Sequence, residues 1–424
     1  MSNGAYAYQE TLKVDTSDSR VINGSSTSTV LVYPGELNSQ YGWSTITTFD
    51  VGGDISLFNG KLDITGDYYI RRNLDMIVEG DALASTFGSK SAKGNYADSS
   101  TYGWEIMVNY NNSFMVGSKR MNLGLRAGLA DNWTIIDRFE GNADGKIWKA
   151  GGTNYKGQRL GEIWGFKVNP DCPIFQNQEQ IDNAFGEGVA WKSSFMRNHD
   201  TGAGKNSALP GELWILDLNG DNDITKGSET LADPGDMTII GNMYGRYNFT
   251  FGFDIDYANW FVSATFNGLG KKDIPLPGNH LLYSGYRYSY NPMTKWLVNN
   301  SWTEDNPNAF MPALSIPQAD NEQRTWLGSK NFNQWSQKVT RNPIDRYLIN
   351  AAFINLQNIQ IGYNIPKKLL SKINLAAAKV YFSGENLWNW SPMYKTYGRD
   401  FDVATLGYGG DDYNFGVDWW QSYV

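Results

Sequence analysis

The sequence predicts an all-β protein whose strands form part of a large antiparallel transmembrane β-barrel with long extracellular loops. Three observations indicate this fold class. Apolar and polar residues alternate over stretches of about 9 to 11 residues, the length that a tilted strand needs to cross a bilayer. Short turns join some of these stretches, whereas long polar segments separate others. No window reaches the roughly 18 consecutive apolar residues that a membrane-spanning helix needs.

The composition agrees with strands that carry one polar face. Aromatic residues make up 14% of the 424 residues, and 45 residues are glycine, while the mean hydropathy is only −0.47. The net charge of −8 argues against a nucleic-acid partner, which would need a basic face. Cys172 is the single cysteine, so an internal disulfide is excluded.

The first predicted hairpin spans residues 49–70. Residues 49–57 place apolar side chains at odd positions, and residues 62–70 place them at even positions. Asn59-Gly60 lies between the two runs and is a strong signal for a tight turn. We expect the apolar faces to contact lipid and the turn to be periplasmic. The face expected to line a wet lumen carries Asp50, Asp54, Lys61, Asp63, Asp67 and Arg71.

The same alternation predicts further strands, which are residues 104–110, 121–129, 247–255, 260–266, 354–363 and 378–387. Gly117-Ser118-Lys119 and Ala258-Asn259 are predicted to be short hairpin turns. The long polar stretches at 81–101, 139–243 and 271–345 are predicted to be loops, with one short helix at 178–185. Short turns at one end and long loops at the other are typical of an outer-membrane barrel.

One stretch carries the beginning of a calcium-loop pattern. Asp217, Asn219, Asp221 and Asp223 stand at alternate positions, where a tight loop can point their oxygen atoms at one hard cation. The last ligand of such a loop should be a carboxylate at its twelfth position, which here is Ser228. A structural Ca²⁺ is therefore one interpretation, and a loop of Asx turns whose carboxylates face water is the other. No cofactor is required.

Aromatic residues in the predicted loops are candidates for substrate binding, because aromatic rings stack on the apolar C–H edges of sugars. The candidates are Trp191, Trp214, Tyr286 and Tyr288. The alternative is that these rings pack the loops together or contact a partner protein. Catalysis has little support, since the only two histidines, His199 and His280, are far apart in the sequence. We therefore predict a protein that is not an enzyme.

Five segments, in this order, resemble one known family. They are TTFDVGGDISLFNGKLDITGDYYIRRNLDMIV, IWGFKVNPDCPIFQNQEQIDNAF, PGELWILDLNGDNDIT with the following IIGNMYGRYNFTFGFDIDYANWFVSATFNGLGKKD, AAFINLQNIQIGYNIPKKLLSKI and KVYFSGENLWNWSPMY. Together they cover most of the chain. The chain resembles the C-terminal part of a SusC/RagA-type TonB-dependent outer-membrane transporter, a family of the Bacteroidetes that imports glycans and peptides.

The resemblance implies a partial barrel over residues 1–424, roughly the C-terminal half of a barrel of about 22 strands. Either residues 413–420 are its last strand, or the last strand is missing from this sequence. A plug domain, which contacts the TonB complex in this family, would precede this segment. The resemblance also implies a place in the outer membrane of a Gram-negative bacterium and a SusD-like lipoprotein as partner. The substrate would be a nutrient. An oligosaccharide is the first choice, and a peptide is the second. The alternative is a soluble or surface-attached carbohydrate-binding β-protein whose apolar strand faces pack against each other.

Overall fold

The structure is a computed structural model that forms two compact units. Unit 1 comprises Met1–Asn112 and Gly124–Leu160, and unit 2 comprises Ser113–Leu123 and Gly161–Val424. The described residues are 13–15, 20–22, 25–27, 30–32, 42–81, 83–84, 86, 91–147, 154–185, 192–193, 210–221, 223–275, 295–313, 316–317, 323–324, 343–371 and 375–397.

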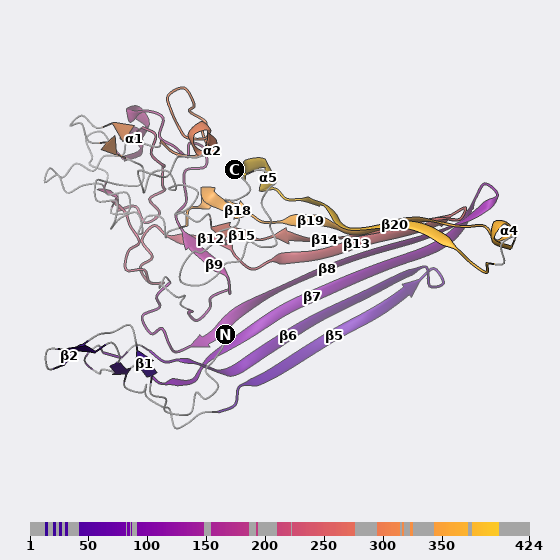
Figure 1. Cartoon of the computed structure of the whole chain (residues 1–424). Helices are drawn as coiled ribbons and strands as arrows, with labels where there is room; N and C mark the ends of the chain where they lie inside the picture. Colours follow the sequence, from indigo (N-terminus) through magenta and orange to yellow (C-terminus); the bar gives the residue numbers. More distant parts are fainter. Residues whose placement is uncertain are drawn as a thin grey trace. The chain divides into compact units, whose positions relative to one another are not determined.

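Four long strands form the sheet of unit 1 (Figure 1), and the hairpin end of the last two, Ser113–Leu123, belongs to unit 2. They are β5 (Thr45–Leu57), β6 (Leu62–Glu79), β7 (Lys93–Val116) and β8 (Lys119–Phe139). Their order in the sheet is β8-β7-β6-β5, so neighbours in the sequence are neighbours in space. The pairs β5–β6 and β6–β7 are antiparallel. The predicted strands at 49–70 and 104–129 lie within these four.

Unit 2 carries a second run of four long strands (Figure 1). They are β13 (Arg246–Tyr257), β14 (Trp260–Lys271), β19 (Phe353–Asn364) and β20 (Lys379–Trp390). Their order is β20-β19-β14-β13, and the three pairs between them are antiparallel. The predicted strands at 247–266, 354–363 and 378–387 are therefore confirmed.

The predicted turns are confirmed, and their backbone angles explain the residues found there. Phe58, Asn59 and Gly60 adopt φ values of 56°, 58° and 77° between β5 and β6. Ala258 and Asn259 adopt 54° and 76° between β13 and β14. Two consecutive positive φ values match the right-handed twist of the flanking strands, and asparagine and glycine tolerate them best.

The remaining elements are short. The strands are β1 (Lys13–Asp15), β2 (Arg20–Ile22), β3 (Ser25–Thr27), β4 (Val30–Val32), β9 (Glu162–Gly165), β10 (Lys192–Ser193), β11 (Asp223–Ile224), β12 (Thr238–Asn242), β15 (Asp273–Pro275), β16 (Ile316–Pro317), β17 (Gln323–Arg324) and β18 (Leu348–Asn350). The helices are α1 (Gln178–Phe185), α2 (Lys295–Asn299), the 3-10 helix η2 (Asp345–Tyr347), α4 (Lys367–Leu370) and α5 (Tyr394–Tyr397). The predicted helix at 178–185 is confirmed as α1. In the described part of the chain, no helix is long and apolar enough to cross a membrane.

The prediction of a loop over residues 81–101 was wrong for its second part. β7 begins at Lys93, and its residues Lys93–Thr101 pair with β6. These residues lack the apolar alternation because they extend beyond the apolar part of the strand. Ser99 and Ser100, which point to opposite faces of β7, are both buried there, so polar side chains are buried on both faces.

The long polar stretches of unit 2 are folded around a hydrophobic core of their own, which we call the loop core. Its residues come from four segments that are distant in the sequence. The loop core contains Phe166, Val168, Ile174, Phe175, Ile181, Leu213, Ile215, Ile224, Met237, Met311, Ile344 and Tyr347. Phe166, Phe175, Leu213 and Met311 are 0% exposed. A buried apolar cluster of this size stabilises the assembly of segments that carry little regular secondary structure.

Within the sheets, aromatic rings cover glycines of the neighbouring strand. A Cβ atom at Gly103 on β7 would collide with the ring of Tyr69 on β6. A Cβ atom at Gly362 would likewise meet the ring of Phe261. These glycines make space for a ring, since neither position has a left-handed φ.

Substituting Gly103 therefore tests the packing of unit 1. We expect Gly103→Ala to lower the free energy of unfolding by about 1 to 3 kcal/mol, because the methyl group overpacks against Tyr69. Gly53→Ala is the matched control, since nothing lies within 4 Å of its Cβ position. Denaturant titration of both variants in detergent provides the measurement, and equal stability of the two would contradict this packing.

Candidate functional site

The strand register produces one apolar and one polar face on the sheet of unit 1. Directly opposite residues lie on the same face of a sheet. On the apolar face, Ile55 pairs with Ile64, which pairs with Val108. Phe49 is 60% exposed and Ile55 is 56% exposed, so this face is not covered by another layer within the described residues.

The opposite face of the same sheet is acidic. Gly52, Asp67 and Glu105 form one cross-strand row. Asp54 lies in the neighbouring row and accepts a hydrogen bond of 2.6 Å from the Thr65 hydroxyl. The predicted division of the first hairpin into an apolar and a charged face is confirmed.

The sheet of unit 2 repeats the division with a different polar chemistry. Its apolar rows include Ile255–Val262–Ile361–Phe382 and Phe251–Phe266–Leu356–Trp388. Its polar rows are mostly hydroxyl and amide side chains rather than carboxylates. Those rows are Thr250–Asn267–Asn355–Asn389, Asp254–Ser263–Gln360–Ser383 and Gly252–Thr265–Asn358–Glu385. Such side chains both donate and accept hydrogen bonds, so this face suits uncharged polar groups.

One acceptor on this polar face is unusual. The Oδ1 atom of Asn267 is buried and has no hydrogen-bond partner among the described residues. A buried amide oxygen without a partner costs free energy unless water or a ligand supplies the donor. The polar face of unit 2 therefore has unused hydrogen-bonding capacity.

The apolar face forms a band of defined height. In unit 1 the band runs from the row of Leu57 to the row of Phe49, and in unit 2 from Tyr257 to Phe249. About nine residues at 3.3 Å each span roughly 30 Å along the strand, or about 21 to 25 Å when the strand is tilted by 35–45°. That height matches the apolar band of outer-membrane barrels, about 25 Å.

Aromatic side chains lie at both limits of the band in unit 2. Trp260 and Tyr363 meet beside the tight turn with ring centroids 5.0 Å apart. Trp388 and Trp390 lie at the other limit and are 45% and 49% exposed. Exposed aromatic rings at the two edges of an apolar band form the girdles that sit at membrane–water interfaces.

The loop core determines where Trp214 lies. Its ring stacks on Phe175 with the centroids 4.7 Å apart, and it packs against the loop core. Trp302 lies beside the same core and donates a 2.9 Å hydrogen bond from Nε1 to Gln176. Trp214 therefore helps to pack the loops together, and its role in substrate binding stays a prediction. Trp191, Tyr286 and Tyr288 lie outside the described residues, as do His199 and His280.

The acidic loop that begins at Asp217 is organised by a residue that sequence reasoning missed. Asp236 is fully buried, and its carboxylate accepts hydrogen bonds from the backbone N–H groups of Leu218 and Thr225, both at 2.7 Å. The N–H of Asn219 contributes a longer bond of 3.5 Å. Burial raises the pKa of the Asp236 carboxyl, and these hydrogen bonds oppose the rise. The intervening segment is closed by Ser228, which donates to Asp233 through both N–H and hydroxyl, at 2.8 and 2.6 Å.

The predicted metal ligands largely bond within their own loop. Asp217 accepts a 2.6 Å bond from the N–H of Gly220. The Asn219 amide donates to Asp221 at 3.0 Å and accepts from the N–H of Asp221 at 3.0 Å. These are the Asx turns of the alternative interpretation. The side chain of Asp223 lies outside the described residues, and among those described no group of three acidic, histidine or cysteine side chains could hold a metal ion. Calcium binding by this loop stays a prediction.

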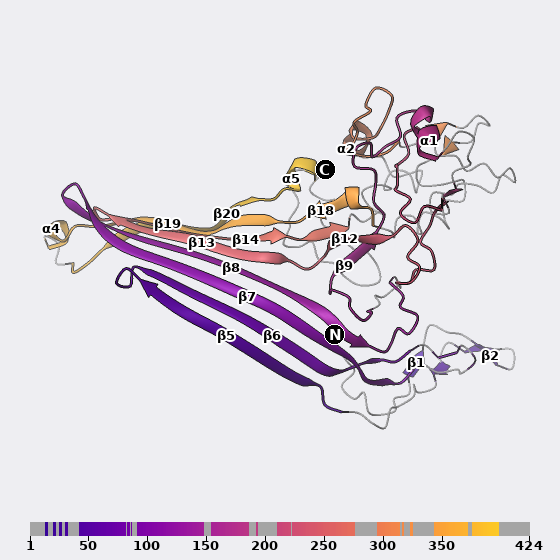
Figure 2. The ribbon, with the colours of Figure 1, turned by 180° about the vertical axis from the view of Figure 1, so that it is seen from behind.

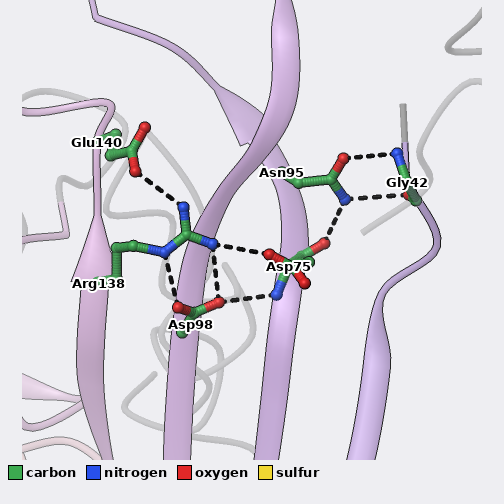
Figure 3. Close-up of polar contacts among 6 residues, drawn as sticks. All are labelled: Gly42, Asp75, Asn95, Asp98, Arg138 and Glu140. Atoms are coloured by element: carbon green, nitrogen blue, oxygen red, sulfur yellow. Dashed lines mark hydrogen bonds and ion pairs between the residues drawn. The ribbon is translucent and has the colours of Figure 1, made fainter. Parts of the chain in front are cut away.

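A second polar cluster joins three strands of unit 1 (Figure 3). Arg138 on β8 forms two hydrogen bonds with Asp98 on β7, at 2.7 and 3.0 Å. It also contacts Asp75 on β6 at 3.0 Å and Glu140 at 2.8 Å. These hydrogen bonds lower the pKa of Asp98 and raise that of Arg138.

The cluster stabilises a bulge in β6. The register of β6 against β7 shifts between Asn73 and Met76, and Asp75 has a left-handed φ of 56°. Its N–H donates to Asp98 at 2.7 Å, and its carbonyl accepts from Asn95 at 2.6 Å (Figure 3). Asn95 also exchanges two hydrogen bonds with the backbone of Gly42, at 2.8 and 3.0 Å. Side chains thus satisfy the backbone groups that the bulge removes from the ladder.

No sequence pattern predicts the structural role of Asp236 or of Arg138. Asp236 follows Gly235 directly and precedes β12, outside the alternate positions of the calcium-like pattern. Arg138 lies near the end of β8, and of its partners only Glu140 is near in the sequence. The pairing of separate segments brings Asp236 to its partners and Arg138 to Asp98 and Asp75.

Long antiparallel strands with an apolar band on one face and polar rows on the other are the pattern of a transmembrane β-barrel wall. Curated relatives and solved structures agree with this fold, whereas no family model matches the chain. TonB-dependent receptor P3 of Formosa agariphila is 22% identical over 353 residues, which cover 82% of this chain and 30% of the receptor. TonB-dependent receptor P39 of the same organism is 24% identical over 364 residues, covering 79% and 30%.

Solved structures show the same fold. The RagAB peptide importer in its "open-open" state superposes with a TM-score of 0.62 at 17% identity, over 97% of this chain and 37% of that one. The structure of the RagAB peptide transporter gives 0.60, also at 17% identity, over 97% and 38%. The resemblance to SusC/RagA-type TonB-dependent receptors is therefore confirmed. The chain spans about a third of the length of the curated relatives it matches.

Removing the Asp236 carboxylate should loosen the acidic loop. In Asp236→Ala, the N–H groups of Leu218 and Thr225 lose their acceptor, so we expect a local loss of roughly 2 to 4 kcal/mol. Hydrogen exchange at these two amides is the measurement. Asp233→Ala is the control, because Asp233 accepts from Ser228 and not from Leu218 or Thr225, so exchange at these two amides should change much less. Unchanged exchange in Asp236→Ala would show that the carboxylate does not close the loop.

Removing the Arg138 guanidinium should release the bulge at Asp75. We expect Arg138→Met to speed hydrogen exchange at the Asp75 N–H about tenfold or more, which corresponds to at least about 1.4 kcal/mol. Because the pKa of Asp98 is lowered, this contribution is present above pH of about 4 and is lost as pH falls through the lowered pKa.

The matched control for Arg138 is Lys146→Met, since Lys146 forms an exposed ion pair with Asp144 at 3.4 Å. We expect this variant to leave the exchange of Asp75 unchanged. If both substitutions have the same effect, net charge rather than the hydrogen-bonded cluster explains the result.

Proposed function

We propose that the chain forms part of the barrel wall and of the extracellular loops of a TonB-dependent nutrient importer in the outer membrane of a Gram-negative bacterium. The observation that supports this most directly is the exposed apolar band, whose height matches an outer-membrane hydrocarbon layer. The names of the curated relatives, all TonB-dependent receptors, support the same function. An importer of this kind breaks no bond in its substrate, so the chain is not an enzyme.

The two faces of such a wall would have different surroundings. The apolar band would contact lipid, and the polar rows would face the aqueous path of the substrate. The energised TonB complex would act through a plug region, as the family resemblance implies. The folded loops of unit 2 would contact a SusD-like lipoprotein, because the loop core holds them as one preformed surface.

We propose an oligosaccharide as the substrate. The polar rows of unit 2 are rich in hydroxyl and amide groups, which match the hydroxyl groups of a sugar chain. A peptide is the second candidate, because the RagAB structures are described as a peptide importer and the same amides match peptide groups. Import assays with oligosaccharides and with peptides, in cells with and without the gene, separate the two.

A soluble carbohydrate-binding β-protein is the alternative that the exposed faces disfavour. Such a protein would pack its apolar strand faces against each other. Phe49 and Ile55 in unit 1, and Phe382 in unit 2, are 60%, 56% and 59% exposed instead.

Arginine substitutions on the two faces of one strand test the membrane assignment. Ile55→Arg should destabilise the folded protein in lipid by about 2 to 4 kcal/mol, because it places a charge in the apolar band. Ser56→Arg is the matched control, since Ser56 is the next residue on β5 and lies on the polar face, where a charge stays hydrated. The measurement is refolding of the purified protein into lipid vesicles. Equal tolerance of both arginines would refute the lipid-facing assignment.

A further inference from the structure

Hydrogen bonds hold three connections of unit 2 together at one end of its strands. The Tyr257 hydroxyl donates to the carbonyl of Val116 in the β7–β8 hairpin at 3.2 Å. The N–H of Asn364 donates to the carbonyl of Asn259 in the β13–β14 turn at 2.8 Å. Residues 113–123, 257–261, 363–371 and 375–381 therefore form one surface, which we call the turn rim. α4 lies at this end of the strands in both views (Figures 1 and 2).

The turn rim is basic, although the chain as a whole is acidic. Its charged residues are Lys119, Arg120, Lys367, Lys368 and Lys379, and all five are exposed. The residues of the turn rim include no aspartate or glutamate, whereas the chain has a net charge of −8. None of the five forms an ion pair with a carboxylate in the described ranges. Their charges are therefore available to an anionic ligand.

Exposed apolar side chains lie among these charges. Met115 is 64% exposed, Trp260 55%, Leu369 57% and Val380 66%. Pro366 precedes α4, whose Leu370 is buried, so the neighbouring Leu369 is held outward. The turn rim therefore exposes apolar side chains next to lysines, although contact of apolar side chains with water costs free energy.

Lys379 lies on the polar face of the strands of unit 2, on the same face as Phe261 and Tyr381, and covers both of these rings. Its Nζ atom lies 5.3 Å from the ring centroid of Tyr381 and 5.9 Å from that of Phe261. The aliphatic stem of such a lysine covers aromatic surface while the ammonium group reaches the polar layer. On the opposite face, the turn rim contains the row Tyr257–Trp260–Tyr363–Val380. This is the last row of the apolar band, so the turn rim is continuous with the band where Trp260 and Tyr363 meet.

We propose that the turn rim binds the phosphate headgroups of anionic phospholipids at the membrane surface next to the short turns. Lysines beside exposed leucine, methionine and tryptophan form an interfacial lipid-binding pattern, with the apolar groups in the acyl boundary and the ammonium groups on phosphates. An acidic protein would complement the charges but would leave the apolar side chains next to the band unexplained. This inference rests on the proposed function, because it requires the apolar band to lie in a membrane.

Lipid titration followed by native mass spectrometry tests this binding. The protein is purified from membranes in a nonionic detergent and titrated with phosphatidylglycerol or with phosphatidylethanolamine of the same acyl chains. We expect tighter retention of phosphatidylglycerol. The double variant Lys367→Gln/Lys368→Gln should weaken that retention about 25-fold, since each lysine contributes roughly fivefold. Lys367→Arg/Lys368→Arg should restore it, because the charge is kept.

The matched control removes the same charge elsewhere in unit 2. Lys167→Gln/Lys295→Gln substitutes two exposed lysines outside the turn rim and should leave phosphatidylglycerol retention unchanged. Equal retention of the two lipids, or equal loss in both double variants, would overturn the proposal. Loss of an acidic co-purifying protein without any change in lipid retention would overturn it in favour of a protein contact.

Membrane fractionation separates a failure of this inference from a failure of the proposed function. Protein found in the outer membrane without a phosphatidylglycerol preference contradicts only the lipid-binding turn rim. Protein absent from the outer membrane contradicts the proposed function and removes the membrane surface on which the turn rim would act.

Discussion

The structure depends on one constraint: each backbone hydrogen bond of a long strand must find its partner on a neighbouring strand, in a register that keeps side chains of one kind on one face. A slip by one residue would exchange the faces of a whole strand. The pairing of Ile55 with Ile64 and Val108 shows that the register is kept across three strands. The tight turns at Asn59-Gly60 and Ala258-Asn259 fix the register at the closed end of each hairpin.

The same constraint explains where side chains, rather than a neighbouring strand, supply the hydrogen bonds of the backbone. At the bulge around Asp75, backbone groups leave the pairing between β6 and β7, and Asp98 and Asn95 supply their hydrogen bonds. In the acidic loop, Asp236 supplies acceptors for backbone N–H groups that belong to no strand. At both sites a carboxylate accepts hydrogen bonds from backbone N–H groups that have no backbone partner. Both sites lie outside the apolar band. The polar chemistry of the two units differs, with carboxylates on the polar face of β5–β7 and mostly amides and hydroxyls on that of β13–β20.

The sequence was sufficient to predict the strands within the apolar band, because the two faces of a strand differ in polarity there and the residues alternate accordingly. The turns, the helix α1 and the two-faced character of the first hairpin followed from the same local signals. Residues Lys93–Thr101 were missed because a strand that continues above the band no longer needs apolar residues on one face. The loop core was missed for another reason. Phe166 and Ile344 are separated by 178 positions, and no local pattern reveals that they meet. The grouping of Arg138 with Asp75 and Asp98 is non-local in the same way.

The loop core also constrains the order in which this protein can assemble. Its members span from Phe166 to Tyr347, so the cluster cannot close until synthesis has passed η2. Contacts so distant along the chain form slowly, since a long loop must be closed before any contact is gained. Until then Phe166, Phe175 and Leu213 remain exposed on an unfinished chain. A chain built in this way exposes apolar side chains for as long as its synthesis takes to reach Tyr347.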